Sequence, residues 1–446
     1  MIPTLDAFTV IFIFLYLVII ALAFWFYSQA KFRDEKEKQK LFLKALFFKI
    51  IIGISFALIY SLFYRKGDTF IYFRNASSWG NMLFTNPFVY FKFLLNQINS
   101  TGMLEMGITD FNPSFRDPAN VATQRYLSFF TILGLKNYYL TIICLNTFLF
   151  ILNWRASQYF AKILPEYQKI IYICILFIPS ATFWGSGILK DGFTFSFGLL
   201  FLVYFHKIFF RHKIGIFNIL KGLFCIYILI SLKPYICYAI IFSGFIWLGF
   251  SYIHLIKNKI IRVFILPVLI FGVGFAGFTV LGTVMDFVGG SYSNIDSLLN
   301  KAVVSQQDLK QEYYKGSSFD IGDFDPTISG ALSVAPKAVV ACLFRPFIWE
   351  AGSVVLFLSA LENTILLILC LLILFKVGIL KLLKQIRHNP FLIFCLTFSI
   401  SMALGVGLST SNFGALVRFK IPMMPFFLMF LLIVFQNHKE SKKISE

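Results

Sequence analysis

The sequence predicts an all-α fold: a polytopic membrane helical bundle with about 11 transmembrane helices and two long extracytoplasmic segments. Of the 446 residues, 58% are hydrophobic, 19% are aromatic and only 14% are charged. Apolar stretches of about 18 or more residues recur along the chain, and its mean hydropathy is +0.79. A soluble protein of this length cannot bury so much apolar surface, so we expect a lipid bilayer around it.

The apolar stretches give the expected spans in order. They lie at about 8–28, 43–63, 139–161, 167–184, 194–209, 214–232, 236–253, 260–283, 352–375, 391–409 and 421–436. No internal repeat and no low-complexity linker interrupts them. We therefore expect residues 1–446 to form a single integral-membrane domain.

The basic residues between the spans predict the orientation. They concentrate in six segments: 29–49, 155–169, 207–213, 257–262, 376–387 and 439–443. With the eleven spans above, all six lie on one side, which the positive-inside rule assigns to the cytoplasm of a cell inner (plasma) membrane. The N-terminus is then outside and the C-terminus cytoplasmic. These loops account for most of the net charge of +19, and no basic groove with interleaved aromatics remains, so we expect no nucleic-acid partner.

Two extracytoplasmic segments, at about 64–138 and 284–351, are too long to be simple turns. The first contains an amphipathic stretch, Pro87–Ile98, that we expect in the plane of the membrane interface. All five histidines map to the cytoplasmic side, so acid–base chemistry on the outer face must rely on Asp, Glu or Lys. The seven cysteines lie in apolar stretches without C-x-x-C spacing, which argues against a redox or metal site.

Gly67-Asp68-Thr69 directly follows the second span and places a carboxylate at the outer membrane surface. The simpler interpretation is a solvated loop residue or a helix N-cap, a position that favours Asp. A carboxylate at the interface can also act as a general base that takes a proton from an acceptor hydroxyl. Asp68 is therefore a candidate catalytic residue.

Lys190 and Asp191 lie in a glycine-containing outer turn that connects two spans. A hairpin needs a few polar residues, and this alone can explain the pair. A charged pair at the top of a span is nevertheless costly unless it is partnered or faces a cavity. In the functional interpretation, Lys190 binds phosphate and Asp191 orients it or serves as a second catalytic carboxylate.

Four further cations, Lys233, Arg345, Arg418 and Lys420, fall at the predicted outer boundary. Outer connectors are normally poor in Lys and Arg, although long cationic side chains also snorkel to lipid headgroups. Together with Lys190 they form a predicted cationic rim. Such a rim suits the phosphate or diphosphate group of a substrate, which arginine can grip with two hydrogen bonds.

The remaining acidic residues offer structural as well as functional interpretations. Glu350 begins the ninth span and is a candidate substrate-binding residue, and Glu362 lies inside the same span. Intramembrane carboxylates need a partner, so a structural ion pair is equally compatible. Asp320, Asp323 and Asp325 can hold a divalent cation, but a solvated acidic loop is the simpler explanation. We therefore predict no resident metal and no cofactor.

Three features resemble integral-membrane glycosyltransferases of the C-type (GT-C) superfamily, in particular its bacterial dolichyl-phosphate-mannose-transferase-like branch and related surface-polysaccharide assembly proteins. They are Asp68 after an early span, the Lys190-Asp191 turn after Pro-Ser-x-x-Phe-Trp, and the run Arg-Phe-Lys-Ile-Pro-Met-Met-Pro-Phe from Arg418. The resemblance implies a polyprenyl-phosphate-linked sugar as donor, a glycan or lipid as acceptor, and Asp68 as the catalytic carboxylate. It also assigns the late Arg-x-x-x-Pro pattern to Arg418 and Pro422. In that superfamily the catalytic loop usually follows the first span, so an extra N-terminal span is implied here.

Two other classes compete with this interpretation. An O-antigen or exopolysaccharide polymerase would depend on the outer-face arginines, Arg345 and Arg418, and would not need Asp68. A transporter or flippase for a lipid-linked saccharide would need charges through the membrane midplane, where only Glu362 is predicted. The expected function is therefore a membrane glycosyltransferase of the extracytoplasmic face, with these classes as alternatives.

Overall fold

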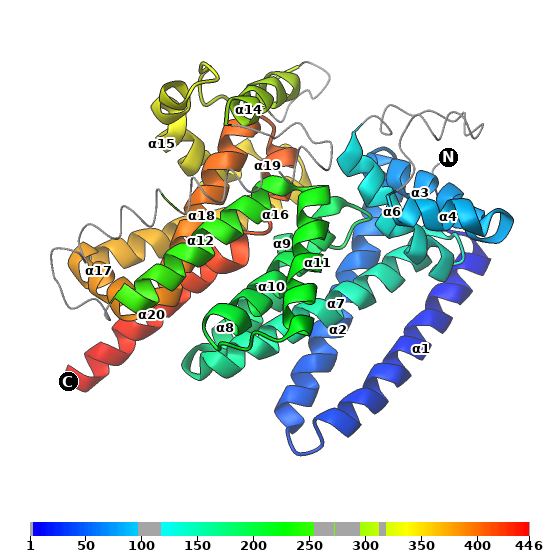
Figure 1. The fold of residues 1–446 in the computed structure, drawn as a ribbon, viewed down its shortest axis with the longest axis horizontal. Helices are drawn as coiled ribbons and strands as arrows, with labels where there is room; N and C mark the ends of the chain where they lie inside the picture. The colour runs from blue at the N-terminus through cyan, green and yellow to red at the C-terminus, as the bar shows by residue number, and fades with distance from the viewer. Residues whose placement is uncertain (1–2, 97–116, 254–271, 273–294, 312–317, 446) are drawn as a thin grey trace. The chain divides into compact units, whose positions relative to one another are not determined.

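The computed structural model describes residues 3–96, 117–253, 272, 295–311 and 318–445 (Figure 1). Within these ranges, seven helices are long and apolar enough to cross a membrane. They are Ala7–Lys31, Lys36–Tyr64, Tyr138–Ile163, Lys190–Phe209, Pro234–Tyr252, Val354–Val377 and Pro390–Ser409. A bent pair, Phe413–Phe419 and Met424–Lys443, is a further candidate. The predicted all-α, multi-pass membrane fold is confirmed.

The structure modifies several of the predicted spans. The span expected at 167–184 is broken, because α8 (Gln168–Leu176) ends before Pro179, the first residue of α9 (Pro179–Trp184). Proline disfavours helical backbone at the residue before it, so the two helices do not merge. The helices α11 (Ile216–Leu232) and α15 (Ile328–Phe344) are apolar but shorter than a full span. The span expected at 260–283 lies outside the described residues except for residue 272, so the count of eleven stays a prediction.

The chain divides into two compact units. The first consists of Met1–Ser157, Thr182–Phe197 and Ser231–Lys233. The second consists of Gln158–Ala181, Gly198–Ile230 and Pro234–Glu446. This division is not visible in the sequence, because each unit is assembled from segments that are separated along the chain.

In the first unit, α1 (Ala7–Lys31) and α2 (Lys36–Leu58) form an antiparallel pair, and α2 continues as the π-helix η1 (Ile59–Tyr64) (Figure 1). α1 exposes large apolar side chains, with Phe14 69% and Phe26 62% exposed. Water would not tolerate such a surface along a whole helix, whereas lipid tails match it. The apolar helices thus indicate association with a lipid bilayer.

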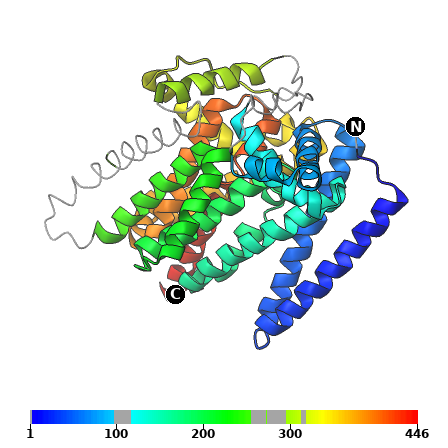
Figure 2. The same cartoon turned by 45° about the vertical axis from the view of Figure 1, so that its right-hand side comes forward.

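Three helices form a cluster at the end of α2 that is farthest from the α1–α2 turn (Figures 1 and 2). They are α3 (Asp68–Thr85), α4 (Pro87–Leu94) and α6 (Pro118–Leu133), and α7 (Tyr138–Ile163) follows them. The Trp79 and Phe93 rings stack with centroids 3.6 Å apart. Arg125 Nε donates to the Phe93 carbonyl at 2.7 Å, which ties α6 to α4. The described residues of the first predicted extracytoplasmic segment therefore form a packed helical cluster. α4 covers the first part of the predicted amphipathic stretch, whose last two residues lie outside the described residues.

The second unit is organised around α18 (Pro390–Ser409), which has its most extensive contacts with four other helices (Figures 1 and 2). These helices are α12 (Pro234–Tyr252), α14 (Ile295–Leu309), α15 and α20 (Met424–Ser445). A β-carbon on Gly407 of α18 would collide with the backbone of Ala338 in α15. The close approach of these two helices therefore requires glycine at this position.

A long helix and a short amphipathic helix follow each other in the second unit. α16 (Val354–Leu372) continues as η7 (Ile373–Val377) and is followed by the short amphipathic helix α17 (Ile379–His388). The 24 residues from Val354 to Val377 rise by about 36 Å, enough to cross the hydrocarbon core of a bilayer. The segment before α16 and the helix α17 after η7 therefore lie at opposite ends of a membrane-length helix.

Candidate functional site

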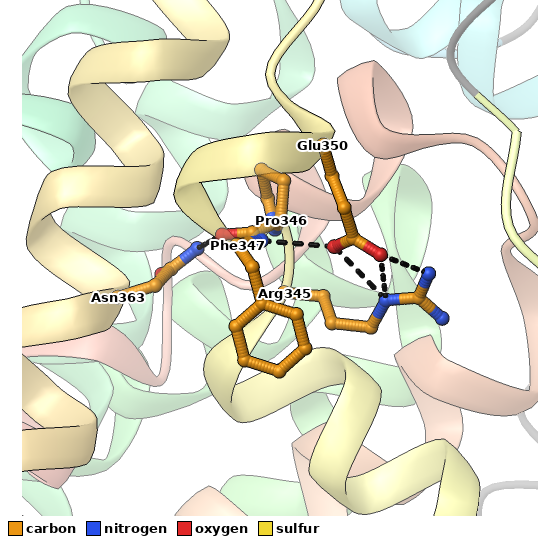
Figure 3. Close-up of polar contacts among 5 residues, drawn as sticks. All are labelled: Arg345, Pro346, Phe347, Glu350 and Asn363. Carbon is orange, nitrogen blue, oxygen red and sulfur yellow. Dashed lines mark hydrogen bonds and ion pairs between the residues drawn. The ribbon is translucent and has the colours of Figure 1, made fainter.

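The most developed polar cluster of the second unit surrounds Arg345, which caps the C-terminus of α15 (Figure 3). Arg345 Nε donates to both carboxylate oxygens of Glu350, at 3.0 and 3.1 Å, and Nη2 also donates to Glu350 Oε1. Glu350 Oε2 in turn accepts from the backbone N–H of Phe347 at 2.9 Å. The side chains of Arg345 and Glu350 remain 24% and 16% exposed. The carboxylate thus fixes the orientation of a guanidinium that solvent can still reach.

Two aromatic rings support the guanidinium from another part of the chain. The carbon of the Arg345 guanidinium lies 4.9 Å from the ring centroid of Phe319 and 5.2 Å from that of Phe413. Both rings are buried, and they stack on each other at 5.0 Å. The Phe319 N–H donates to the Ser411 carbonyl at 2.8 Å and keeps the two segments together. An arginine that is stacked on aromatic faces loses little further freedom when it binds an anion.

Lys420 holds the backbone of the Arg345 segment from inside the unit. Its side-chain nitrogen donates to Asn363 Oδ1 at 2.7 Å and to the carbonyls of Cys342 and Arg345, both at 3.2 Å. Asn363 Nδ2 then donates to the Pro346 carbonyl at 3.2 Å. The sequence predicted Lys420 on a cationic rim open to solvent. The structure corrects this, because Lys420 is only 2% exposed and therefore enclosed. Its observed contacts position Arg345.

One side of the Arg345 guanidinium can donate hydrogen bonds to a ligand. Figure 3 shows the second terminal nitrogen, Nη1, pointing away from Glu350. Nη1 forms no hydrogen bond with any residue that the structure describes. Arg345 is the accessible cation of the cluster, since Lys420 is enclosed. This arrangement is suited to an anionic oxygen, such as one of a phosphate group.

Two other residues singled out in the sequence lie in the second unit. Arg418 in α19 (Phe413–Phe419) is partly exposed, and its guanidinium lies 5.4 Å from the Phe419 ring centroid. Glu362 Oε1 accepts from the backbone N–H of Ser180 at 2.9 Å. The sequence suggested an ion pair for Glu362, and the hydrogen bond is instead to a backbone amide in the first turn of α9. Glu362 thus stabilises the start of a broken helix.

Asp68 is the first residue of α3 in the first unit, and its side chain is exposed. Gly67 precedes it with a φ of 136°, a conformation that favours glycine, and a β-carbon there would lie 2.9 Å from the Tyr60 ring. The next residue, Thr69, is buried and shares a 2.9 Å hydrogen bond with the Tyr138 hydroxyl. The backbone beneath Asp68 is therefore fixed, while the carboxylate faces outward at a helix N-terminus, where negative charge is favoured.

Asp191 and Lys233 form a buried ion pair in the same unit. Lys233 Nζ lies 2.5 Å from Asp191 Oδ1, and the residues are 6% and 0% exposed. Asp191 lies in the first turn of α10 (Lys190–Phe209), where its charge also matches the helix dipole. The sequence suggested Lys190 as the partner of Asp191, but consecutive residues on a helix point in different directions. Lys190 instead pairs with Asp117 at 3.6 Å.

Buried side chains of the first unit hold the turn before Asp191 in place, and one of them is Lys49. Lys49 was counted with the cytoplasmic basic segment, but it is buried within α2, and its Nζ donates to the Gly185 carbonyl at 2.9 Å. Asn146 Nδ2 donates to the Ser186 carbonyl at 2.8 Å. The turn is therefore a packed structural element, and sequence spacing alone gave no signal of either anchor.

The acidic loop of the second unit is occupied by a lysine. Lys310 Nζ lies 2.9 Å from Asp320 Oδ1 and 2.7 Å from Asp323 Oδ1. Among the described residues, no group of three His, Cys, Asp or Glu side chains could hold a metal ion. The hydrogen bond from Lys310, followed by that from the Gly322 N–H, lowers the pKa of Asp320 below its ordinary value.

This lowered pKa predicts a pH-dependent contribution to stability. A carboxylate with a depressed folded-state pKa stabilises the protein above its unfolded pKa of about 4 and loses that contribution as pH falls through the folded value. Because both carboxylates are largely exposed, we expect Lys310→Met to cost at most about 1 kcal/mol at pH 7. Thermal unfolding of both proteins at pH 7 and pH 3 measures this difference, which should shrink at pH 3. A difference of equal size at both pH values would contradict the prediction.

Comparisons with known proteins do not assign the chain to a group. No family model, no curated protein and no solved structure matches it.

Proposed function

We propose that this chain is a membrane glycosyltransferase that acts on a sugar linked to a polyprenyl phosphate. The observation that carries the proposal is the Arg345 guanidinium, which Glu350 and two aromatic rings orient and which keeps Nη1 available. A lipid-linked donor needs a membrane-embedded enzyme, and its phosphate needs a cation that is already positioned. The candidate membrane spans and the Arg345 cluster supply these two requirements.

The proposed reaction transfers the sugar from phosphate to an acceptor hydroxyl of a glycan or lipid. The acceptor oxygen attacks the anomeric carbon, the bond from that carbon to the phosphate oxygen breaks, and the electron pair leaves with the phosphate. Arg345 stabilises the negative charge that develops on the phosphate. The hydroxyl proton goes to a carboxylate base, for which the sequence resemblance suggests Asp68, an exposed residue at the start of α3 in the first unit.

The proposed topology places this chemistry on the extracytoplasmic face. We propose about eleven spans in the plasma membrane, with the N-terminus outside and the C-terminus in the cytoplasm. Asp68 and the basic α1–α2 connection lie at opposite ends of α2, which supports opposite sides for the chemistry and the basic segments (Figures 1 and 2).

An exopolysaccharide polymerase is the second candidate, and the Arg345 cluster favours it equally. Such an enzyme transfers a longer glycan from a polyprenyl diphosphate and relies on arginine for the leaving group. It has no need for a base at Asp68. The two candidates therefore differ in the effect of a single substitution.

Asp68→Asn is expected to abolish sugar release if the chain is the proposed transferase, because an amide cannot accept the proton. Sugar release is followed for purified protein with a panel of polyprenyl-phosphate and polyprenyl-diphosphate sugars. Asp34→Asn is a matched control, since Asp34 is exposed and lies at the other end of α2. Unchanged turnover by Asp68→Asn would favour the polymerase. No turnover of any donor by the wild type would contradict both candidates and favour transport.

A further inference from the structure

A cavity of about 1190 Å³ lies in the second unit, away from the Arg345 cluster. Its walls come from residues 163–167 at the end of α7 and in η3 (Pro165–Tyr167), from η7 and α17, and from the last turns of α20. The Tyr167 hydroxyl donates to Asn437 Oδ1 at 2.9 Å, and Gln436 Nε2 donates to the Glu166 carbonyl at 3.3 Å. These hydrogen bonds join η3 to α20, so two walls of the cavity are held together.

Positive charge dominates the lining. Lys376, Lys381, Lys384 and Lys442 line the cavity, against the single carboxylate of Glu166. Lys376, Lys381 and Lys384 form no ion pair with any residue in the described ranges. Lysines that outnumber the carboxylates of a lining repel one another, and an anion between them relieves this repulsion. The cavity therefore favours an anionic ligand.

α17 has the amphipathic character of a helix at a membrane interface. Leu380 and Leu383 are 79% and 55% exposed, while Lys381 and Lys384 of the same helix line the cavity. A helix with separate apolar and basic sides lies in the plane of a bilayer surface, with its apolar side in the acyl chains. Phe375 in the preceding η7 is 84% exposed and extends the same apolar surface. A lipid that lies against this surface would place its headgroup level with the lysines.

We propose that the cavity binds the phosphate headgroup of an anionic phospholipid. The three lysines contact the phosphate oxygens, and the acyl chains follow the apolar side of α17. The sequence places residues 376–387 in a cytoplasmic segment, where anionic lipids attract basic residues. Because the cavity is at the far end of the α16–η7 helix from Arg345, this lipid site is separate from the proposed transferase chemistry.

The test compares lipid retention by purified protein in a neutral detergent. Phosphatidylglycerol supplies the anionic headgroup and phosphatidylcholine the zwitterionic one, and native mass spectrometry counts the retained lipids. The variant Lys376→Gln/Lys381→Gln/Lys384→Gln removes the cationic lining. The variant Lys31→Gln/Lys36→Gln/Lys44→Gln removes the same charge from exposed lysines of the first unit. Thermal unfolding confirms that each variant is folded.

We expect the lining variant to retain at least 10-fold less phosphatidylglycerol than the wild type, while the control variant retains it normally. Phosphatidylcholine retention should be the same in all three proteins. Replacing the same three lysines by arginine should preserve phosphatidylglycerol binding, which separates charge from folding. Equal losses in the lining and control variants would overturn the proposal, because they would indicate non-specific attraction. Displacement of the lipid by millimolar inorganic phosphate would also overturn it, in favour of a soluble phosphate ligand.

Discussion

Lys233→Met is expected to destabilise the first unit by about 3–5 kcal/mol. The substitution leaves the Asp191 carboxylate, which is 0% exposed, without the ammonium group that lies 2.5 Å from it. A buried charge that loses its partner keeps the full cost of its desolvation. We expect the midpoint of thermal unfolding to fall by roughly 10 °C.

Cys144 is the cysteine of the first unit, and it is partly buried. In a protein that keeps only this cysteine, unfolding of the unit exposes it to a thiol-reactive fluorophore, whose signal rises with temperature. Lys190→Met is the matched control, because the Lys190–Asp117 pair is longer, at 3.6 Å, and half of the Asp117 side chain is exposed. A partly exposed pair should be worth less than about 1 kcal/mol.

The double substitution Lys233→Met/Asp191→Leu tests the cause of the expected loss. Removing both charges leaves no unpaired ion, so much of the lost stability should return. If the double variant is as unstable as the sum of the two single variants, packing and not charge pairing dominates at this site. Similar midpoints for Lys233→Met and Lys190→Met would contradict the importance of the buried pair.

Arg345→Ala is expected to lower turnover of a lipid-linked sugar by about 100-fold or more. The variant removes the cation proposed to stabilise the leaving phosphate, and it leaves Glu350 without its partner. Arg345→Lys should restore little activity, because an ammonium group cannot pair with Glu350 through two nitrogens and still present a free edge.

A binding measurement tests the role of Arg345 without requiring that the donor sugar be known. The affinity of a fluorescent polyprenyl phosphate without a sugar should fall by at least 10-fold in Arg345→Ala. Arg387→Ala is the matched control, since Arg387 is exposed in α17, at the other end of the α16–η7 helix. Equal affinities for wild type and Arg345→Ala, with both proteins folded, would remove Arg345 from the proposed site.

The candidate site was only partly predictable. Arg345 and Glu350 were both singled out from the sequence, and they are close along the chain, so their contact needs only a local turn. Phe319 and Phe413 were missed, although both contact the Arg345 guanidinium. Nothing in the sequence distinguishes these two rings among 58 phenylalanines. The roles of Asp68 and Arg418 remain predictions.

The sequence by itself determined that the chain is all-helical and embedded in a membrane. An apolar stretch of about 20 residues satisfies its own backbone hydrogen bonds as a helix and meets its solvent directly, so no distant contact is needed. Only the tertiary structure decided which charges meet. Lys233 reaches Asp191 across 42 residues, and Lys420 reaches Asn363 across 57. A buried ion must find its partner wherever the helices pack, and sequence spacing does not encode that packing.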